Sequence, residues 1–459
     1  MAIISIKPTS TPLPSSSFKK MDSASGKNCN GATTSSPITF KQLDTLSSEF
    51  SSNAKNTLAM RALSRESYAA ALENREAMKI TNQRSSGRCW LFAGLNVLRV
   101  KLMEKYNMEN MEFSQTFLFF YDKIEKSNWF LQNIINTLDL DLDGREVQHL
   151  LNDPVQDGGQ WDMFVSLVQK YGVAPLEAYP DTFHSMNSRQ MDELITTKLR
   201  TFAKHIRSSF QANSDHSLVE DIRKNALAEI HKILCISLGV PPQGFDWRFY
   251  NKDKKYVEFC NLTPTSFYIN HVESDTTQTV SLINDPRNEY YRLYTVKYLG
   301  NVVGGTPIRY INLPIGELKT LSSQVISDKK KAVWFGCHVG KFVNKGASVL
   351  DLEVIDYSSG FDINFDLNKA ERLEYGDSMM THAMVFTGVQ IENQLPVRWR
   401  VENSWGKDSG SEGYITMSDD WYSEYVYQPK CVFRDNKTGQ TSVFIRECAC
   451  EKILTNRRQ

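Results

Sequence analysis

The chain has 459 residues, with 53 Lys and Arg against 53 Asp and Glu, so its formal net charge is zero. Such a length allows more than one domain, or one large domain with insertions. The balanced charge disfavours a protein that binds nucleic acid or a membrane surface by electrostatics alone. No apolar run approaches the ~18–20 residues of a membrane span.

The first part of the chain divides into a tail and a helical segment. Residues 1–37 are rich in Ser, Thr and Pro, which predicts a disordered tail. An organellar transit peptide is the alternative, but such peptides favour Arg and this tail has Lys. Residues 38–75 are predicted to be helical, because Ala-rich stretches occur there.

Residues 76–185 are predicted to form a helical domain. Four leucines recur on one helix face: Leu91, Leu95, Leu98 and Leu102. This helix is expected to begin near Cys89, just after a Gly-containing loop. Further helices are predicted over 113–126 and over 161–171, and Gly172 is expected to end the second of these.

Residues 186–330 are predicted to be a mainly helical insertion. Two long helices are expected within 188–240. The second has the capping-box spacing of Ser217 and Glu220 and ends at Gly239.

Residues 331–428 are predicted to form a β domain, because apolar strand-like segments recur there, at 332–335, 383–386 and 399–401. Helices in the first part of the chain and strands in the second indicate an α+β fold.

Eight cysteines are scattered along the chain, at positions 29, 89, 235, 260, 337, 431, 448 and 450. No two have C-x-x-C spacing, and no nearby His completes a zinc-binding set. We therefore expect neither a disulfide framework nor a metal site, and a reducing compartment.

Cys89 is the first candidate for chemistry. At a helix N-terminus the macrodipole stabilises the thiolate, which is the nucleophilic form. Without its surroundings, such a Cys is more often a small buried hydrophobe. Gln83 lies six residues upstream in the loop, where its amide and the Cys89 N–H can form an oxyanion hole.

His382 and Asn403 are the other candidates. His382 precedes an apolar strand, where a lone His is usually a satisfied core residue, and Asn403 follows a strand, where Asn is usually a turn residue. Together with Cys89 they supply a nucleophile, a base and an orienting group. Trp405 is placed to shield the bond between His382 and Asn403 from water.

These residues resemble those of the papain-like cysteine peptidases, whose triad is Cys-His-Asn. The separation of Cys89 and His382 exceeds the ~130–150 residues of papain-type enzymes, so an insertion is implied. Several longer strings are similar to the bleomycin hydrolase family: 80–90, 157–163, 293–296, 333–337, 368–373 and 399–406. This resemblance runs from about residue 75 to Gln428.

The resemblance implies a papain-like fold and a cytoplasmic aminopeptidase that acts on peptide substrates without a cofactor. It further implies a homohexamer with active sites on a central channel, for which the insertion is the expected oligomerisation element. Gly158 and Gly159 would match the glycine pair that meets the substrate backbone, and with Trp405 they are the expected substrate-binding residues.

Two departures from the family pattern stand out. His338 occupies a position where the family usually has Asp, and we expect it to be structural. Residues 429–459 form an atypical C-terminal tail that ends in Arg457, Arg458 and Gln459. In the family the C-terminal carboxylate lies in the cleft and anchors the substrate α-amine, so an endopeptidase-type activity is the alternative here.

A second alternative is a non-catalytic nucleic-acid-binding role. Two lysine clusters could serve it: Lys252, Lys254 and Lys255, and Lys329, Lys330 and Lys331. Such clusters are more often solvated surface.

Overall fold

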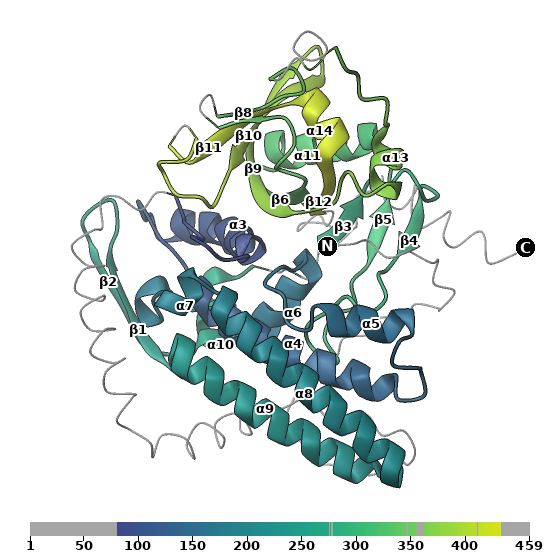
Figure 1. Ribbon diagram of the computed structural model, residues 1–459. Helices are drawn as coiled ribbons and strands as arrows, with labels where there is room; N and C mark the ends of the chain where they lie inside the picture. The colour runs from purple at the N-terminus through teal and green to yellow at the C-terminus, as the bar shows by residue number, and fades with distance from the viewer. Residues whose placement is uncertain are drawn as a thin grey trace, which may run out of the picture.

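The computed structural model describes residues 80–432, except positions 275, 277–278, 346–347, 355–356, 358–361 and 411. The predicted tail 1–37, the predicted helical segment 38–75 and residues 433–459 lie outside the described residues. Figure 1 shows a helical part, formed mainly by the first half of the described chain, against a part built around a large sheet.

The helices, in chain order, are α3 (Cys89–Lys105), α4 (Gln115–Asn136), α5 (Arg145–Asn152), α6 (Trp161–Tyr171), η1 (Leu176–Ala178), α7 (Phe183–Met186), α8 (Arg189–Asn213), α9 (His216–Leu238), α10 (Pro264–Phe267), η2 (Tyr268–Val272), α11 (Ile315–Ser327), α13 (Lys369–Glu374) and α14 (Asp419–Tyr425). The strands are β1 (Phe245–Tyr250), β2 (Tyr256–Leu262), β3 (Thr279–Ile283), β4 (Arg292–Tyr294), β5 (Tyr310–Asn312), β6 (Val333–Cys337), β7 (Val343–Asn344), β8 (Val349–Leu350), β9 (His382–Glu392), β10 (Leu395–Glu402), β11 (Tyr414–Ser418) and β12 (Val426–Val432).

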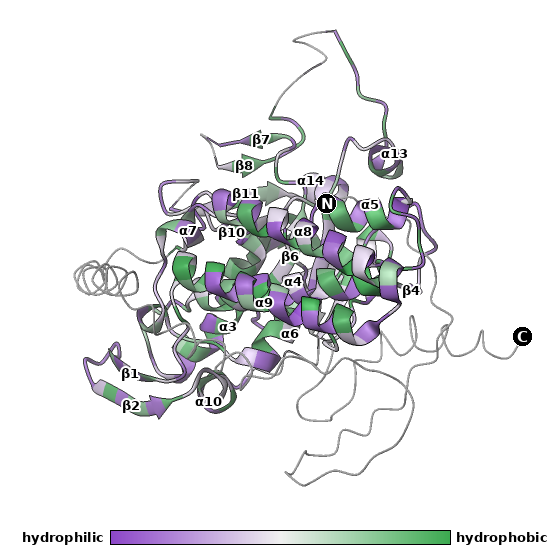
Figure 2. Cartoon of the chain, turned by 60° about the horizontal axis from the view of Figure 1, so that its bottom comes forward, coloured by the Kyte–Doolittle hydropathy of each residue, from purple (hydrophilic) through white to green (hydrophobic). Residues whose placement is uncertain are grey.

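The helical part is organised around α4, which packs against α6, α8 and α9. Its side chains are buried along most of its length. The long pair α8 and α9 bury one face each, and Figure 2 shows hydrophobic and hydrophilic residues mixed along both, as expected for such amphipathic helices.

The predicted helix ends are confirmed in two places and wrong in one. The helix α6 ends at Gly172, which has φ +74°, and a Cβ there would lie 2.2 Å from the Pro264 carbonyl oxygen. The helix α9 ends at Gly239. Its N-cap, however, is Asp215, whose carboxylate accepts the N–H groups of residues 217 and 218. The predicted capping box therefore fails, because Asp215 already occupies the cap position one residue before the helix.

The large sheet has ten strands in the order β4-β5-β3-β12-β6-β9-β10-β11-β8-β7. All five residues of β6 are buried, because neighbouring strands and the helix α11 surround it. The predicted strands at 332–335, 383–386 and 399–401 correspond to β6, β9 and β10.

Residues 186–330, predicted to be a mainly helical insertion, contain both helices and strands. They carry α8 and α9, but also the hairpin β1–β2 and the strands β3, β4 and β5 of the large sheet. At the start of the predicted tail, β12 runs through Gln428 to Val432 and pairs with both β6 and β3. The sheet therefore contains strands that come before residues 331–428 in the sequence and a strand that extends beyond them.

The helix α3 lies where the two parts meet, packed against α4 and α6 on one side and against β6 and β9 on the other. The predicted face of Leu91, Leu95, Leu98 and Leu102 is buried. The first two turns are buried on their other faces as well. This position places the start of α3 beside the strand that begins with His382.

Candidate active site

Cys89 is the first residue of α3, and only 8% of it is exposed. The residue before it, Arg88, is completely buried and forms an ion pair with Asp181 at 2.7 Å. Its guanidinium also faces the rings of Phe92 and Phe119. These contacts fix the chain immediately before Cys89, so that the Cys89 thiol lies at the positive end of the helix dipole.

His382 and Asn403 lie together at one edge of the sheet. His382 begins β9, Asn403 follows the last residue of β10, and the two strands are antiparallel neighbours. The Nε2 atom of His382 is 2.9 Å from the Oδ1 atom of Asn403. Because an amide oxygen can only accept a hydrogen bond, Nε2 carries the proton and Nδ1 is left as the basic nitrogen.

Trp405 covers this pair. Its ring centroid lies 4.9 Å from that of the His382 imidazole, with 32° between the planes. Asn403 is 2% exposed. The Trp405 ring and the burial of Asn403 thus keep competing water from the hydrogen bond between His382 and Asn403.

Cys89 begins α3 and His382 begins β9, and these two elements pack against each other. The backbone N–H groups of Ala383, Trp90 and Cys89 act on the thiol of Cys89 and favour its ionised form. Burial works in the opposite direction and raises the pKa of the Cys89 thiol to about 11. Burial likewise lowers the pKa of His382 to about 4, although the hydrogen bond that His382 donates to Asn403 opposes this. Neither group ionises readily alone, so charge separation here requires a proton to pass between them.

Gln83 is held in the loop before α3 by contacts with Ser404. Its backbone N–H donates to the Ser404 carbonyl at 2.8 Å, and its Oε1 accepts from the Ser404 hydroxyl at 2.7 Å. The Nε2 group donates to the Ser86 carbonyl at 2.6 Å. An amide nitrogen has two N–H donors, so this arrangement directs Nε2 toward the loop that leads to Cys89.

A buried charge ties the helix to the strand that precedes Asn403. Glu402, the last residue of β10, accepts from Arg99 at 2.5 Å and from Asn96 at 2.9 Å, and both donors lie on α3. Asn96 also donates to Thr81 at 3.1 Å. The loop, the helix and the strand that carry Gln83, Cys89 and Asn403 are therefore fixed to one another.

Gly158 and Gly159 lie just before α6, close to the residue that follows Cys89. A Cβ on Gly159 would lie 2.6 Å from the Trp90 indole, whereas a Cβ on Gly158 would meet only Gln156 at 3.5 Å. The Trp90 Nε1 donates to the Asp157 carbonyl at 2.7 Å. The indole therefore packs under the glycine pair and requires the absence of a side chain at Gly159.

Asp157 connects this glycine loop to the loop before Cys89. Its carboxylate accepts from the Gly87 N–H at 2.7 Å and from the Ser188 hydroxyl at 2.6 Å. It also pairs with the buried Lys123 at 2.6 Å, and this ion pair holds the pKa of Asp157 well below its usual range. Lys123 in turn contacts Asp192 at 2.6 Å.

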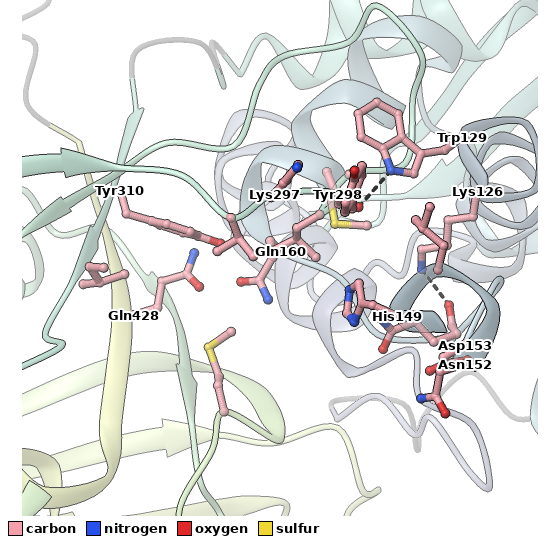
Figure 3. Close-up of a pocket in the computed structure, with 18 of the residues that line it drawn as sticks. Lys126, Trp129, His149, Asn152, Asp153, Gln160, Lys297, Tyr298, Tyr310 and Gln428 are labelled. Carbon is pink, nitrogen blue, oxygen red and sulfur yellow. Dashed lines mark hydrogen bonds between the residues drawn. The ribbon is translucent and has the colours of Figure 1, made fainter. Parts of the chain in front are cut away.

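A mostly apolar cavity of about 290 Å³ adjoins the glycine loop (Figure 3). Gln156 and Gln160, on either side of the glycine pair, belong to its wall, as does Met380, two residues before His382. Figure 3 shows Tyr310 and Gln428 on the wall formed by the sheet, and Lys126, Trp129 and His149 on the wall formed by the helices. The cavity thus lies between the two parts of the molecule.

His338, which follows β6, makes a separate contact. Its Nδ1 is 3.0 Å from the Ser378 hydroxyl, which in turn contacts the Tyr427 hydroxyl at 2.5 Å. Burial lowers the pKa of His338. These contacts join β6 and β12 to the segment before His382.

The comparison with protein families agrees with this geometry. A family model described as the Peptidase C1-like family matches residues 37–441. The chain belongs to this family. It is a cysteine peptidase with the papain-like α+β fold. The match extends past Gln428, where the sequence resemblance was expected to stop.

Relatives of this peptidase are similar over most of their length. Bleomycin hydrolase of Mus musculus is 43% identical over 363 residues, covering 77% of this chain and 80% of the relative. Aminopeptidase C of Listeria monocytogenes is 39% identical over 407 residues, covering 85% of this chain and 91% of the relative. The crystal structure of PepW from Lactobacillus rhamnosis superposes with a TM-score of 0.76 at 37% identity. The superposition covers 87% of this chain and 93% of PepW.

Sequence reasoning did not single out the charged residues beneath this site. Lys123 and Lys126 lie three residues apart on α4, among Phe117, Phe120 and other buried apolar side chains. Charges in such a helix are costly unless paired, and this was the signal available in the sequence. Asp157 stands in the string that carries the resemblance, beside the two glycines.

Within residues 80–432 and their stated gaps, no three or more His, Cys, Asp or Glu are grouped so that they could hold a metal ion. None of the helices described is both long and apolar enough to span a bilayer.

Proposed function

We propose that this peptidase is an aminopeptidase in which Cys89 is the nucleophile, His382 the acid and base, and Asn403 the residue that orients His382. The observation that carries the assignment is the 2.9 Å contact between His382 and Asn403, beside a Cys at a helix N-terminus. The relatives named aminopeptidase C support the same activity.

In the proposed acylation step, Nδ1 of His382 takes the proton of the Cys89 thiol. The thiolate sulfur then attacks the scissile carbonyl carbon, and the carbonyl oxygen becomes an oxyanion. The Nε2 donor of Gln83 and the backbone N–H of Cys89 stabilise that oxyanion. The C–N bond breaks as the imidazolium gives its proton to the leaving amine, which leaves a thioester on Cys89.

Deacylation uses the same residues in reverse. His382 accepts a proton from a water molecule, whose oxygen attacks the thioester carbon. The C–S bond then breaks, the carboxylic product leaves, and the proton returns to the sulfur. Asn403 holds the imidazole in the tautomer that both steps require, and Trp405 excludes water from their bond.

Gly158 and Gly159 are proposed to meet the substrate main chain, with Trp405 forming another part of the binding surface. The apolar cavity beside them suits a hydrophobic substrate group, since Met163, Met380 and Tyr310 form part of its wall. Burial of such a group would favour substrates with large apolar side chains.

The proposed assembly is a homohexamer in the cytoplasm, as the resemblance implies. An endopeptidase-type activity remains the second candidate, because the tail 429–459 departs from the family pattern. A nucleic-acid-binding role is the third. The two lysine clusters are exposed, and they lie apart, one at the turn of the β1–β2 hairpin and the other after α11 (Figure 1).

The test compares Cys89→Ser with Cys260→Ser, which removes an exposed thiol on β2. The substrate is an aminoacyl fluorophore under reducing conditions. We expect Cys89→Ser to lose activity by about a thousandfold or more with its fold intact, and Cys260→Ser to keep it. Activity of Cys89→Ser within tenfold of the wild type would overturn the assignment. Salt-dependent DNA binding that persists in Cys89→Ser would favour the third candidate.

A further inference from the structure

Lys126 is a buried lysine on α4 whose three donors are all engaged. Its Nζ lies 2.8 Å from the Gln156 carbonyl oxygen, 2.6 Å from the Gly158 carbonyl oxygen and 2.6 Å from the Asp122 carboxylate. Its side chain is 5% exposed. An ammonium group has three N–H donors. Lys126 donates two hydrogen bonds to backbone carbonyls of the glycine loop, and the Asp122 carboxylate balances its positive charge.

The bond to Gly158 determines the orientation of one peptide plane. In a trans peptide the carbonyl of Gly158 and the N–H of Gly159 point in opposite directions. Because Lys126 holds the carbonyl, the N–H of Gly159 is directed away from Lys126 and away from the helix that carries it. Glycines rotate more freely than other residues, so a plane between two of them needs such an anchor.

Lys126 also contacts the start of the catalytic helix. Its Nζ lies 5.2 Å from the centre of the Trp90 ring, and Trp90 is the residue after Cys89. The same ring packs against Gly159. Lys126 therefore contacts both the glycine loop and the residue that follows Cys89, and Figure 3 shows it on the wall of the adjoining cavity.

We infer that Lys126 is a positioning residue that orients the Gly158–Gly159 peptide toward the main chain of the substrate. This inference rests on the proposed role of the glycine pair. Lys126 does not touch the reacting atoms. Its loss removes an orienting contact from substrate binding and leaves the thiol and imidazole chemistry in place.

The experiment compares two reactions in Lys126→Met and in the wild type. The first is hydrolysis of a short peptide with a free amino end, followed by chromatography to give kcat and KM. The second is inactivation by iodoacetamide, a reagent with no peptide backbone that reports the reactivity of Cys89. Lys170→Met is the matched control, since it removes an ion pair between α6 and Glu125 of α4 and does not touch the glycine loop.

We expect Lys126→Met to raise KM about tenfold or more while kcat changes by less than about threefold. The rate of inactivation by iodoacetamide should stay within about twofold of the wild-type rate. Lys170→Met should change neither peptide hydrolysis nor this inactivation by more than about twofold. Equal losses in both reactions, or no change in KM, would overturn the inference.

A second variant covers the case in which Lys126→Met does not fold. In Lys126→Met the buried Asp122 carboxylate lacks its counter-charge, which destabilises the fold. The double variant, Lys126→Met with Asp122→Asn, removes the negative charge of Asp122 as well. The double variant is read by the same criteria. A wild type whose Cys89 is labelled but which hydrolyses no peptide would overturn the proposed function together with this inference, whereas normal KM in the folded variants would overturn this inference alone.

Discussion

Asn403 accepts a hydrogen bond from His382 across the end of two antiparallel strands, at 2.9 Å. The register of β9 and β10 pairs Glu402 with Val385, so the beginning of one strand and the end of the other share one edge. The pairing of these strands thus brings together two residues that are 21 positions apart in the sequence.

Asn403→Ala tests the orienting role. The imidazole would lose the partner that holds its tautomer, so we expect kcat to fall by about 10–100-fold, with a smaller change in KM. Gln390→Ala, which removes an exposed amide further along β9, should leave kcat unchanged. The measurement is hydrolysis of an aminoacyl fluorophore. Equal kcat values for Asn403→Ala and the wild type would contradict the role.

The pH dependence of Cys89 labelling by iodoacetamide should show two steps. Below the His382 pKa of about 4 both groups keep their protons, so the labelling rate is low. Between this value and the Cys89 pKa of about 11 the pair shares one proton, which burial keeps mainly on the sulfur. Labelling then proceeds through the minor thiolate–imidazolium form, whose fraction does not change with pH. Above about 11 the proton is lost, and the free thiolate reacts faster still.

The rate is measured by tryptic mapping of the label between pH 3 and 11. The exposed Cys260 provides an internal comparison. From about pH 5 to about pH 8 the Cys89 rate should stay constant, whereas the Cys260 rate should rise with pH, as expected of an exposed thiol, whose free pKa is ~8.5. A single step near that value for Cys89 would show that His382 does not activate it.

A methyl group at each glycine of the pair should have different effects. Gly159→Ala places a Cβ 2.6 Å from the Trp90 indole, so we expect a loss of stability of about 1–3 kcal/mol and lower activity. In Gly158→Ala the new Cβ meets only Gln156, at 3.5 Å. The free energy of unfolding of this variant should lie within about 1 kcal/mol of the wild-type value. Chemical denaturation measures both. Equal destabilisation would show that Trp90 moves aside freely.

The C-terminal tail should weaken discrimination between free and blocked substrates. Residues 429–459 carry seven Lys and Arg against three Asp and Glu, and these positive charges would repel a substrate ammonium group. We expect the kcat/KM ratio of an aminoacyl fluorophore to its N-acetylated twin to be below about tenfold, or ~1.4 kcal/mol. A large ratio that disappears on deletion of residues 445–459 would show that the tail anchors substrates.

Much of the local structure could be predicted from the sequence. The start of α3 at Cys89, the span of α6 and the end of α9 depend on patterns within a few residues, namely leucine spacing and glycines beyond the last turn. The failed capping box has the same local origin, since Asp215 competes for the same N–H groups.

The makeup of the sheet could not be predicted in the same way. The strands β3 and β5 lie within the residues expected to be mainly helical, yet β3 pairs with β12 from the other end of the described chain. Short strands carry little periodic signal of their own. Their pairing is set by partners that are distant in sequence.

The sequence by itself determined the chemistry available to this peptidase: a Cys at a helix start, a His before an apolar strand, an Asn before Trp405, and a glycine pair. Each is encoded by residue type and by neighbours along the chain. Only the tertiary structure decided how they are held. The Lys126 bonds to the glycine loop and the Glu402 contact with α3 join segments far apart in sequence. Such buried charges are stable only when folding brings their partners within hydrogen-bonding distance.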